Sequence, residues 1–591
     1  MDLQCTDNGG KMVFVLLNWI YIVTTSFLVG YAVCGMLSGV LGYQVREPVS
    51  MVGVGLVTVT VYAQAFSLFY KVGAAANLVL VLVCLVIALA ARQQIIAYIG
   101  SAWQDSGAVW KAVLAVSIVV WCFCTSRGYM HYDSDLYHAQ SIRWIEEYGV
   151  VKGLGNIHVR FAYNSSFFAL SALYSMRFLG VRPLHTVNGL LALLLWTQVL
   201  PLFDIKKRRG SRTLVADFAR LGALYYLTVI YSDVVAPASD YAIMCTVFLI
   251  IIKWLALLAR GEESAAPYAL LCVACAFAVS LKLTAGLILI LVAKPAAMLL
   301  GALDAKRKWR EIGIYLLLGI VTVAPWLART VILSGYLLYP FPALDVFSVD
   351  WKMDAATAAR DAAEIKAYGR GLNNAELVNL PLSAWMPAWF QALPTLGKLF
   401  ILADIGCLLI FVLLVIRAVC RARRGEQTQG EYLLVLGAVM ASYGFWQFSA
   451  PLLRYGYAYV LLVFMITIGI LCDILIKYFD KRQKKDMIEK TAVAGVVLLW
   501  AFMAVKMGTL VRYVCAVWHQ TAYVWQQDYG KYELDCYEVK GVRFYYPIQG
   551  DRTGYEHFPS LPRQTEIYFR GESMDEGFWS ETKGMETNGE R

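Results

Sequence analysis

Long apolar runs follow one another through almost the whole chain and limit what it can fold into. A helix needs about 20 apolar residues to cross a bilayer. Fourteen runs approach that length, at 12–39, 49–70, 74–98, 109–127, 183–203, 213–231, 236–258, 266–281, 283–301, 312–332, 398–419, 431–449, 455–477 and 490–510. Because lipid offers no partner for free backbone groups, each run is predicted to be helical. A further run at 165–179 is shorter and ambiguous.

The composition indicates the same class of protein. Hydrophobic residues make up 59% and charged residues 16% of the 591 positions, whereas soluble domains carry about 25% charged residues. This composition excludes a soluble enzyme, a disordered chain and a nucleic-acid-binding protein. The formal net charge of +10 comes from short basic clusters between apolar runs, a pattern typical of membrane orientation rather than polyanion binding.

The basic clusters predict the topology. Four of them lie at 206–212, 306–310, 417–424 and 477–485, and an even number of apolar runs separates each from the next. The positive-inside rule then places all four in the cytoplasm. The same parity places 128–164, 333–397 and 511–591 outside, provided that 165–179 is an interfacial or re-entrant segment. A wrongly assigned span elsewhere is the alternative.

These patterns predict an all-α integral membrane protein with about 13–15 transmembrane helices. Residues 1–510 would form the polytopic domain, with 333–397 as an outer cap loop that is helical over 354–370. Residues 511–591 are polar and would form a small extracytoplasmic appendage. Within it GVRFYYPIQGD alternates like a strand and then turns. The appendage is too short for a large core of its own and is expected to lean on the cap.

The outer loop 128–164 concentrates ionisable side chains. A short amphipathic helix is predicted from Leu136 to Ile145, because apolar residues recur there at helical spacing. Asp135 could cap that helix. The loop also holds three of the six histidines of the chain, namely His131, His138 and His158.

Asp133 and Asp135 follow directly on a predicted span, at the membrane–water boundary. A carboxylate there can act as a general base that activates a hydroxyl close to a lipid-borne electrophile. A solvated loop with one capping aspartate is the alternative. His138 lies close enough in sequence to suggest a metal site, but neither HxH nor HExxH spacing occurs. No metal is therefore predicted.

Further ionisable residues lie at the ends of predicted spans, and parity places them all on the outer face. They are Asp233, Asp240, Lys282, Arg329 and Arg454. Ionisable groups are costly at such depth, so each is a candidate for a functional site. Lysine and arginine would suit a phosphate or pyrophosphate leaving group, through charge-assisted hydrogen bonds. Snorkelling of these side chains to the lipid headgroups is the alternative.

The stretch HYDSDLYHAQSIRWIEEYGVVKGLGNIHVRFAYNSSFFALSALY resembles a family of bacterial multipass membrane proteins. The recurring pattern of that family is roughly YDxxLYHxQxIRWIxEYGVVxGLGNxHxRxxxNSSxF. The likeness continues in PASDYAIMCTVFLIIIKW, LSGYLLYPFPALDVFSVDWK, GVRFYYPIQGD and RGESMDEGFW, and so covers most of the chain.

More distantly, the layout resembles the GT-C membrane glycosyltransferases. Those enzymes carry an acidic residue in an outer loop just after a span, use polyprenyl-phosphate-linked sugars and usually invert the anomeric centre. The resemblance matches Asp133 to the base, with Asp135 as the second candidate. About three spans precede this module here, which departs from the GT-C layout. The resemblance implies an inverting, metal-independent enzyme of the bacterial inner membrane that needs no cofactor.

The expected function is therefore sugar transfer at the outer leaflet. The expected partners are the lipid bilayer, a polyprenyl-phosphate-linked donor and a glycan or lipid acceptor, and no nucleic acid. Lys282, Arg329 and Arg454 would neutralise the leaving phosphate. The other predicted substrate-binding residues are His138, Arg143, Asn156, His158, Arg160, Asn164 and Asp240. The alternatives are a flippase for lipid-linked oligosaccharides, which would predict inverted repeats, a polysaccharide polymerase or ligase, and a structural scaffold.

Overall fold

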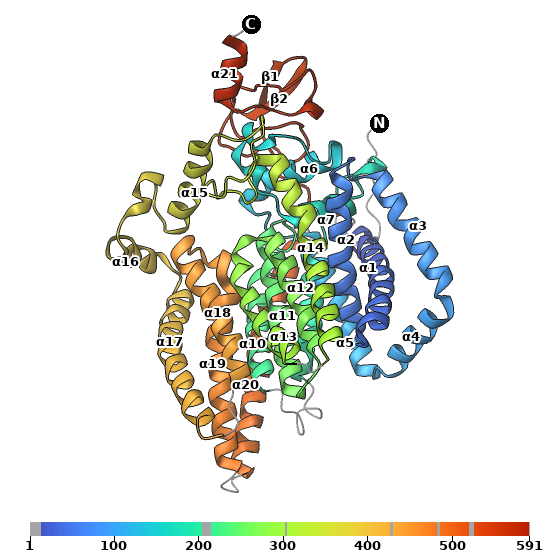
Figure 1. Ribbon diagram of the computed structural model, residues 1–591, viewed down its shortest axis with the longest axis vertical. Coiled ribbons are helices and arrows are strands. Elements are labelled where there is room, and N and C mark those ends of the chain that lie inside the picture. The colour runs from blue at the N-terminus through green and yellow to red at the C-terminus, as the bar shows by residue number, and fades with distance from the viewer. Residues whose placement is uncertain are drawn as a thin grey trace.

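A computed structural model describes residues 13–203, 214–301, 304–425, 430–480, 485–518 and 525–589 (Figure 1). These residues are mostly helical, and their one sheet has two strands. The predicted basic cluster at 206–212 lies outside the described residues, as do Lys481, Arg482 and Lys484 of the last cluster.

Eight helices of the described chain are long and apolar enough to cross a membrane. They are α1 (Val13–Leu41), α2 (Pro48–Ser67), α5 (Ala108–Ser126), α11 (Ser239–Arg260), the continuous pair η6 and α13 (Leu283–Leu300), α14 (Ala305–Ser334), α17 (Thr395–Ala422) and α19 (Leu453–Tyr478 of Leu453–Asp480). The protein is thus a mostly helical, multi-pass membrane protein.

The sequence predicted more spans than these eight, because several apolar runs form a bent pair of helices, shorter helices or helices outside this set. The run at 74–98 forms α3 (Ala74–Ala90) and α4 (Arg92–Gln104), which meet at an angle of 84°, and together they would give a ninth span. The runs at 183–203 and 266–281 give the shorter helices α8 (Val187–Val199) and α12 (Ala265–Leu281). The remaining runs form α10 (Leu214–Ile230), α18 (Gly430–Ser449) and α20 (Lys485–Trp518).

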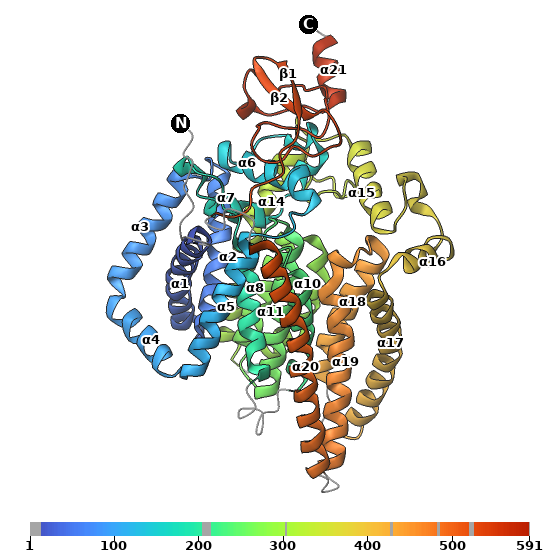
Figure 2. The ribbon, with the colours of Figure 1, turned by 180° about the vertical axis from the view of Figure 1, so that it is seen from behind.

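Helix packing follows from where the small and the apolar residues lie. Gly30 and Gly55 bring α1 and α2 together, because a Cβ built on Gly55 would lie 1.7 Å from the carbonyl oxygen of Ser26. Small residues permit such close backbone approach between membrane helices. In α11, 67% of the most apolar window is buried, against 22% in α17. Thus α11 is central and α17 is peripheral, as their positions in Figures 1 and 2 show.

The three segments predicted to be outside gather at one end of the helical bundle (Figure 1). The first comprises η1 (Ser134–His138), α6 (Ala139–Glu147), η2 (Leu154–Asn156) and η3 (Val159–Ala162). The second comprises α15 (Ala355–Gly369), η7 (Ala375–Asn379) and α16 (Leu382–Ala392), which confirms the predicted cap helix. The third is the tail, residues 525–589, with β1 (Leu534–Val539), β2 (Val542–Pro547), η8 (Met574–Glu576) and α21 (Glu581–Gly589).

The run at 165–179 is too short to cross the membrane. Its helix α7 (Ser166–Tyr174) has nine residues, about 14 Å of helix against roughly 30 Å of hydrocarbon. The 3₁₀ turn η4 (Arg177–Leu179) follows it. The parity argument needs only that this segment does not cross the membrane, and all nine residues of α7 are buried within the protein. The basic residues 306–310 begin α14, whose other end contacts 128–164 through the Gly153 amide and the Ile332 carbonyl, 2.8 Å apart.

The tail packs mainly on the 128–164 segment rather than on the cap. The strands β1 and β2 pair in antiparallel fashion around a two-residue turn, Lys540-Gly541, in which both φ angles are positive. Phe544 and Phe578 of the tail share a core with Trp144 and Leu154. The expected contact with the cap is present but smaller, and it includes the pair between Arg570 and Asp350. The helix α20 continues to Trp518, past the predicted boundary at residue 510.

Candidate functional site

Four of the predicted site residues meet where three helices and the outer loop come together. Asp133 precedes η1, Asp240 lies in the first turn of α11, Lys282 ends α12 and Arg454 lies in the first turn of α19. Arg454 Nη2 is 2.9 Å from Asp133 Oδ2, and its Nε is 3.0 Å from Asp240 Oδ2. Lys282 donates to Asp240 Oδ1. We call these four residues the ion cluster.

The ion cluster balances two carboxylates with two cations. The Asp240 side chain is 7% exposed, and Asp133 is the more accessible carboxylate at 24%. Removing one partner from a buried ion pair leaves an uncompensated charge, so the arrangement keeps all four side chains in place. Asp133 Oδ1 accepts no hydrogen bond from the described residues. It belongs to the more exposed carboxylate of the cluster, and the described residues give it neither a hydrogen bond nor an ion pair.

Two further residues contact the ion cluster and were not among the predicted site residues. His131 Nδ1 accepts the backbone N–H of Asp133 at 3.0 Å and lies 3.2 Å from Arg454 Nη1. Burial lowers the pKa of His131, and Arg454 lowers it further, while Asp133 raises it. The Tyr455 hydroxyl accepts from Arg454 at 3.0 Å, and its ring centroid is 3.6 Å from Lys282 Nζ, a cation–π contact. In the sequence, only their closeness to Asp133 and to Arg454 could have indicated His131 and Tyr455.

Arg329 lies apart from the ion cluster and has neutral partners. Its Nε donates to Asn164 Oδ1 at 3.0 Å and its Nη1 to the Ser67 hydroxyl. Arg329 is 3% exposed, and no carboxylate of the described chain lies within ion-pair distance. The Ser165 hydroxyl donates to Leu281, the residue before Lys282, at 2.8 Å. Arg329 is therefore a buried cation without a counter-charge. It is connected to the ion cluster only indirectly, because its partner Asn164 precedes Ser165, which bonds to the residue before Lys282.

Asp135 has a different role from the one that its position in sequence suggests. It does not cap the helix: Oδ1 accepts the Gly530 N–H at 3.0 Å and Oδ2 the Tyr532 hydroxyl at 2.8 Å. Its carbonyl oxygen accepts the N–H groups of Thr553 and Gly554. Burial raises the pKa of Asp135. This aspartate therefore fastens the tail to the outer loop.

Arg143 and Asn156 also hold the tail. Arg143 Nη1 donates to the carbonyls of Tyr555, at 2.6 Å, and Glu556, at 2.5 Å. Asn156 Nδ2 donates to Trp351 of the cap at 3.0 Å and to Phe578 of the tail at 3.2 Å. Both side chains thus connect outer segments to one another, and neither contacts the ion cluster.

The remaining predicted residues lie around these two regions. His138 is buried and His158 is half-buried, and desolvation lowers the pKa of each to about 3, so both rings are neutral. Arg160 pairs with Asp361 of α15 at 3.2 Å and so braces the cap. Asn164 binds α14 through the Trp326 carbonyl at 2.8 Å. Within the described ranges, no group of three or more His, Cys, Asp and Glu side chains could hold a metal ion.

Comparison with known proteins places the ion cluster inside a family. Residues 12–461 match a family described as a domain of unknown function (DUF8201). The matched range includes all four residues of the ion cluster and ends before the tail. No curated protein matches the chain.

Proposed function

For this chain, which belongs to the DUF8201 family, we propose a membrane glycosyltransferase with GT-C-like architecture. It would transfer a sugar from a polyprenyl-(pyro)phosphate-linked donor to a glycan or lipid acceptor, in cell-surface polysaccharide synthesis. The site would lie at the outer leaflet of the bacterial inner membrane, with the C-terminal tail on the same side. The observation that supports this proposal is the ion cluster, which joins an accessible carboxylate to two cations at the ends of membrane helices.

Asp133 is the proposed general base. It would take the proton from an acceptor hydroxyl while that oxygen forms a bond to the anomeric carbon from the face opposite the leaving group. The bond from the anomeric carbon to the lipid phosphate breaks, and its electron pair leaves with the phosphate. Asp133 suits this role better than Asp135, because both oxygens of Asp135 already accept bonds from the tail.

The cations would stabilise the leaving phosphate. Lys282 and Arg454 are held by Asp240, so their positions are fixed before substrate binds, and such preorganised charge is often the largest catalytic contribution. Arg329 supplies the positive charge that no carboxylate of the described chain balances. An anionic phosphate near Asn164 would compensate it, because a buried charge without a partner is costly.

Transfer by the purified protein tests this proposal. The full chain is incubated with polyprenyl-phosphate-linked labelled sugars and candidate acceptors, and the new covalent product is measured. Asp133→Asn should lower the rate about 10²–10⁴-fold. The matched variant Asp135→Asn keeps the same change of charge two residues away and should retain most of the rate. Full activity of Asp133→Asn would refute the base assignment.

The same assay separates the alternatives. Donor that crosses the bilayer with no new covalent product would indicate a flippase and contradict the proposal. Product that grows by repeated units, or that appears only with a completed glycan, would identify a polymerase or a ligase. These share the leaving group and differ in the acceptor.

A further inference from the structure

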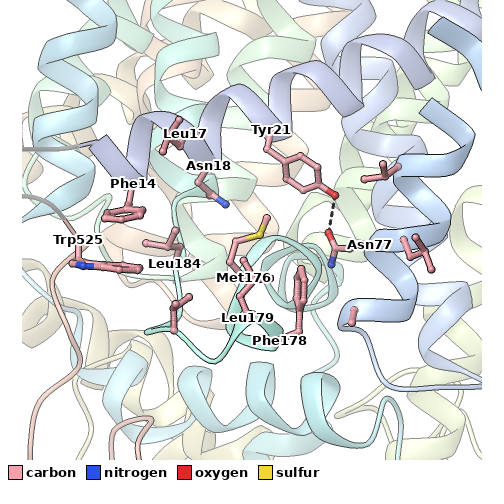
Figure 3. A pocket seen from close by; sticks show the side chains of 14 residues that line it. Phe14, Leu17, Asn18, Tyr21, Asn77, Met176, Phe178, Leu179, Leu184 and Trp525 are labelled. Carbon is pink, nitrogen blue, oxygen red and sulfur yellow. Dashed lines mark hydrogen bonds between the residues drawn. The ribbon is translucent and has the colours of Figure 1, made fainter. Parts of the chain in front are cut away.

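An apolar groove lies between α1, α3 and η4, away from the ion cluster (Figure 3). Its volume is about 540 Å³, and its lining includes Leu17, Leu78 and Leu179. The polar side chains at the groove are already engaged. Asn18 donates to the Tyr174 carbonyl at 2.9 Å, and Asn77 accepts the Tyr21 hydroxyl at 2.8 Å. The groove therefore presents hydrocarbon and few free polar groups.

The groove faces the lipid. Leu17, Leu78 and Leu179 are 52%, 60% and 63% exposed, and α1 is one of the candidate spans. The helices α1 and α3 begin at the end of the bundle that carries the outer segments (Figure 2). The groove therefore lies near the proposed outer headgroup level, where apolar side chains contact acyl or isoprenoid chains.

A polar cleft of about 570 Å³ adjoins the groove, and Val181 lines both. The tail and the turn after α7 form the cleft, whose charged lining residues are the cations Arg177, Arg182 and Lys531 and the carboxylates Asp528 and Glu556. Arg182 pairs with Asp528 at 3.4 Å. Arg177 and Lys531 have no carboxylate within ion-pair distance in the part of the chain that the structure describes. The cleft thus has more cations than carboxylates, and two of its cations are unpaired, directly beside a hydrocarbon surface.

We infer that the groove and the cleft together bind one anionic membrane lipid, with a hydrocarbon chain in the groove and its phosphate at Arg177 and Lys531. Charge complementarity selects this occupant, because an apolar chain alone would not need the cations and a free phosphate would not need the groove. Charge-assisted hydrogen bonds to phosphate are the strong ones in such a site. The site shares no lining residue with the ion cluster, so it does not depend on the proposed transfer reaction.

Trp525 provides a reporter inside the groove. Its ring stacks on Phe14 with centroids 3.9 Å apart, as Figure 3 shows. The full chain is placed in phosphatidylcholine vesicles that contain a small fraction of brominated phosphatidylglycerol or, in parallel, of brominated phosphatidylcholine. The difference in fluorescence between the wild type and Trp525→Phe isolates the quenching at this position. The anionic lipid should quench Trp525 at a lower mole fraction than the neutral lipid.

Removing the cations tests the headgroup contact. The double variant R177Q/K531Q should need about tenfold more anionic lipid for half-quenching. Arg360→Gln, on the cap and 79% exposed, is the control and should behave as the wild type. Added inorganic phosphate should not displace the lipid. Asp133→Asn should bind it unchanged, which separates this test from that of transfer.

Two results would overturn the inference. Equal quenching by the neutral and the anionic lipid would show that the cations do not select the headgroup. Absence of quenching by either lipid would show that the groove holds no lipid chain and is covered by protein, for example by a second copy.

Discussion

The two aspartates of the outer loop, Asp133 and Asp135, are two residues apart and engage different parts of the molecule. Asp133 pairs with a cation at 2.9 Å, and its side chain is 24% exposed. Asp135 accepts bonds from a neutral amide and a hydroxyl of the tail, with both oxygens occupied. The partners of each carboxylate, rather than its place in the sequence, therefore distinguish the candidate base Asp133 from the anchor Asp135.

The same distinction holds for the two regions around them. The ion cluster is made of charged side chains from elements far apart in the sequence, which pair with one another. At the loop–tail interface, many hydrogen bonds join a side chain of the loop to the backbone of the tail, such as Gln140 to the Gly554 carbonyl at 3.0 Å and Arg143 to the Tyr555 carbonyl at 2.6 Å. Backbone acceptors are fixed by the fold. We therefore expect substitutions in the ion cluster to act on chemistry and those at the interface to act on tail docking.

The largest effect is expected for Arg454→Gln. Arg454 pairs with Asp133 and Asp240 and its side chain is 17% exposed, so its loss leaves buried carboxylate charge uncompensated. The free energy of unfolding should fall by about 3–5 kcal/mol, and sugar transfer should be lost. Denaturant titration in detergent measures the first quantity. Unchanged stability would show that the ion cluster is not a buried charge network and does not differ in this way from the loop–tail interface.

A pH dependence should distinguish the interface from the ion cluster. Burial raises the pKa of Glu146 to about 7, and its carboxylate accepts the Tyr555 hydroxyl of the tail. Because the folded state raises this pKa, the contribution to stability is full below pH 4.5 or so and is lost as the pH rises through about 7. The shift corresponds to about 3 kcal/mol at most.

The rate at which a protease cleaves the tail, measured between pH 5 and 8, checks this dependence. Relative to Glu146→Gln, protection of the wild type should fall with rising pH, because the variant lacks the part of the dependence that comes from Glu146. The difference between the two proteins cancels the opposite trend of His138, His158 and His185. Burial lowers the pKa of each of these to about 3, so their contribution is lost as the pH falls below about 6.5. Identical profiles would contradict the role assigned to Glu146.

Arg143→Gln should loosen the tail without stopping transfer. It removes charge-assisted hydrogen bonds to the carbonyls of Tyr555 and Glu556, with an expected cost of about 1.5–3 kcal/mol in tail docking. Limited proteolysis of the tail and the transfer assay are run on the same preparation, with Arg360→Gln as the surface control. If transfer falls as far as it does in Asp133→Asn, the two regions are not separable and the comparison fails.

The sequence predicted a mostly helical, multi-pass membrane protein, because apolar length depends on local composition, but it overestimated the number of spans. It predicted that Asp240, Lys282 and Arg454 share a face with Asp133, and these four residues do meet. It could not show that Asp135 turns to Tyr532, almost 400 residues away, because that contact depends on where the tail docks. His131 and Tyr455 were missed because their contacts, too, depend on tertiary packing. Their roles arise from packing of the loop against α19 rather than from spacing.

The smallest effect is expected for Asp350→Asn, at the contact between the cap and the tail. Arg570 Nη2 lies 2.7 Å from Asp350 Oδ2, but the Asp350 side chain is 45% exposed. Water and ions screen such a pair, so its loss should cost about 0–1 kcal/mol. Protease protection of the tail should then stay close to that of the wild type and well above that of Arg143→Gln. If Asp350→Asn instead exposes the tail as strongly, the cap holds the tail more than the shared core around Phe544 and Trp144 does, and the original expectation that the tail leans on the cap would be restored.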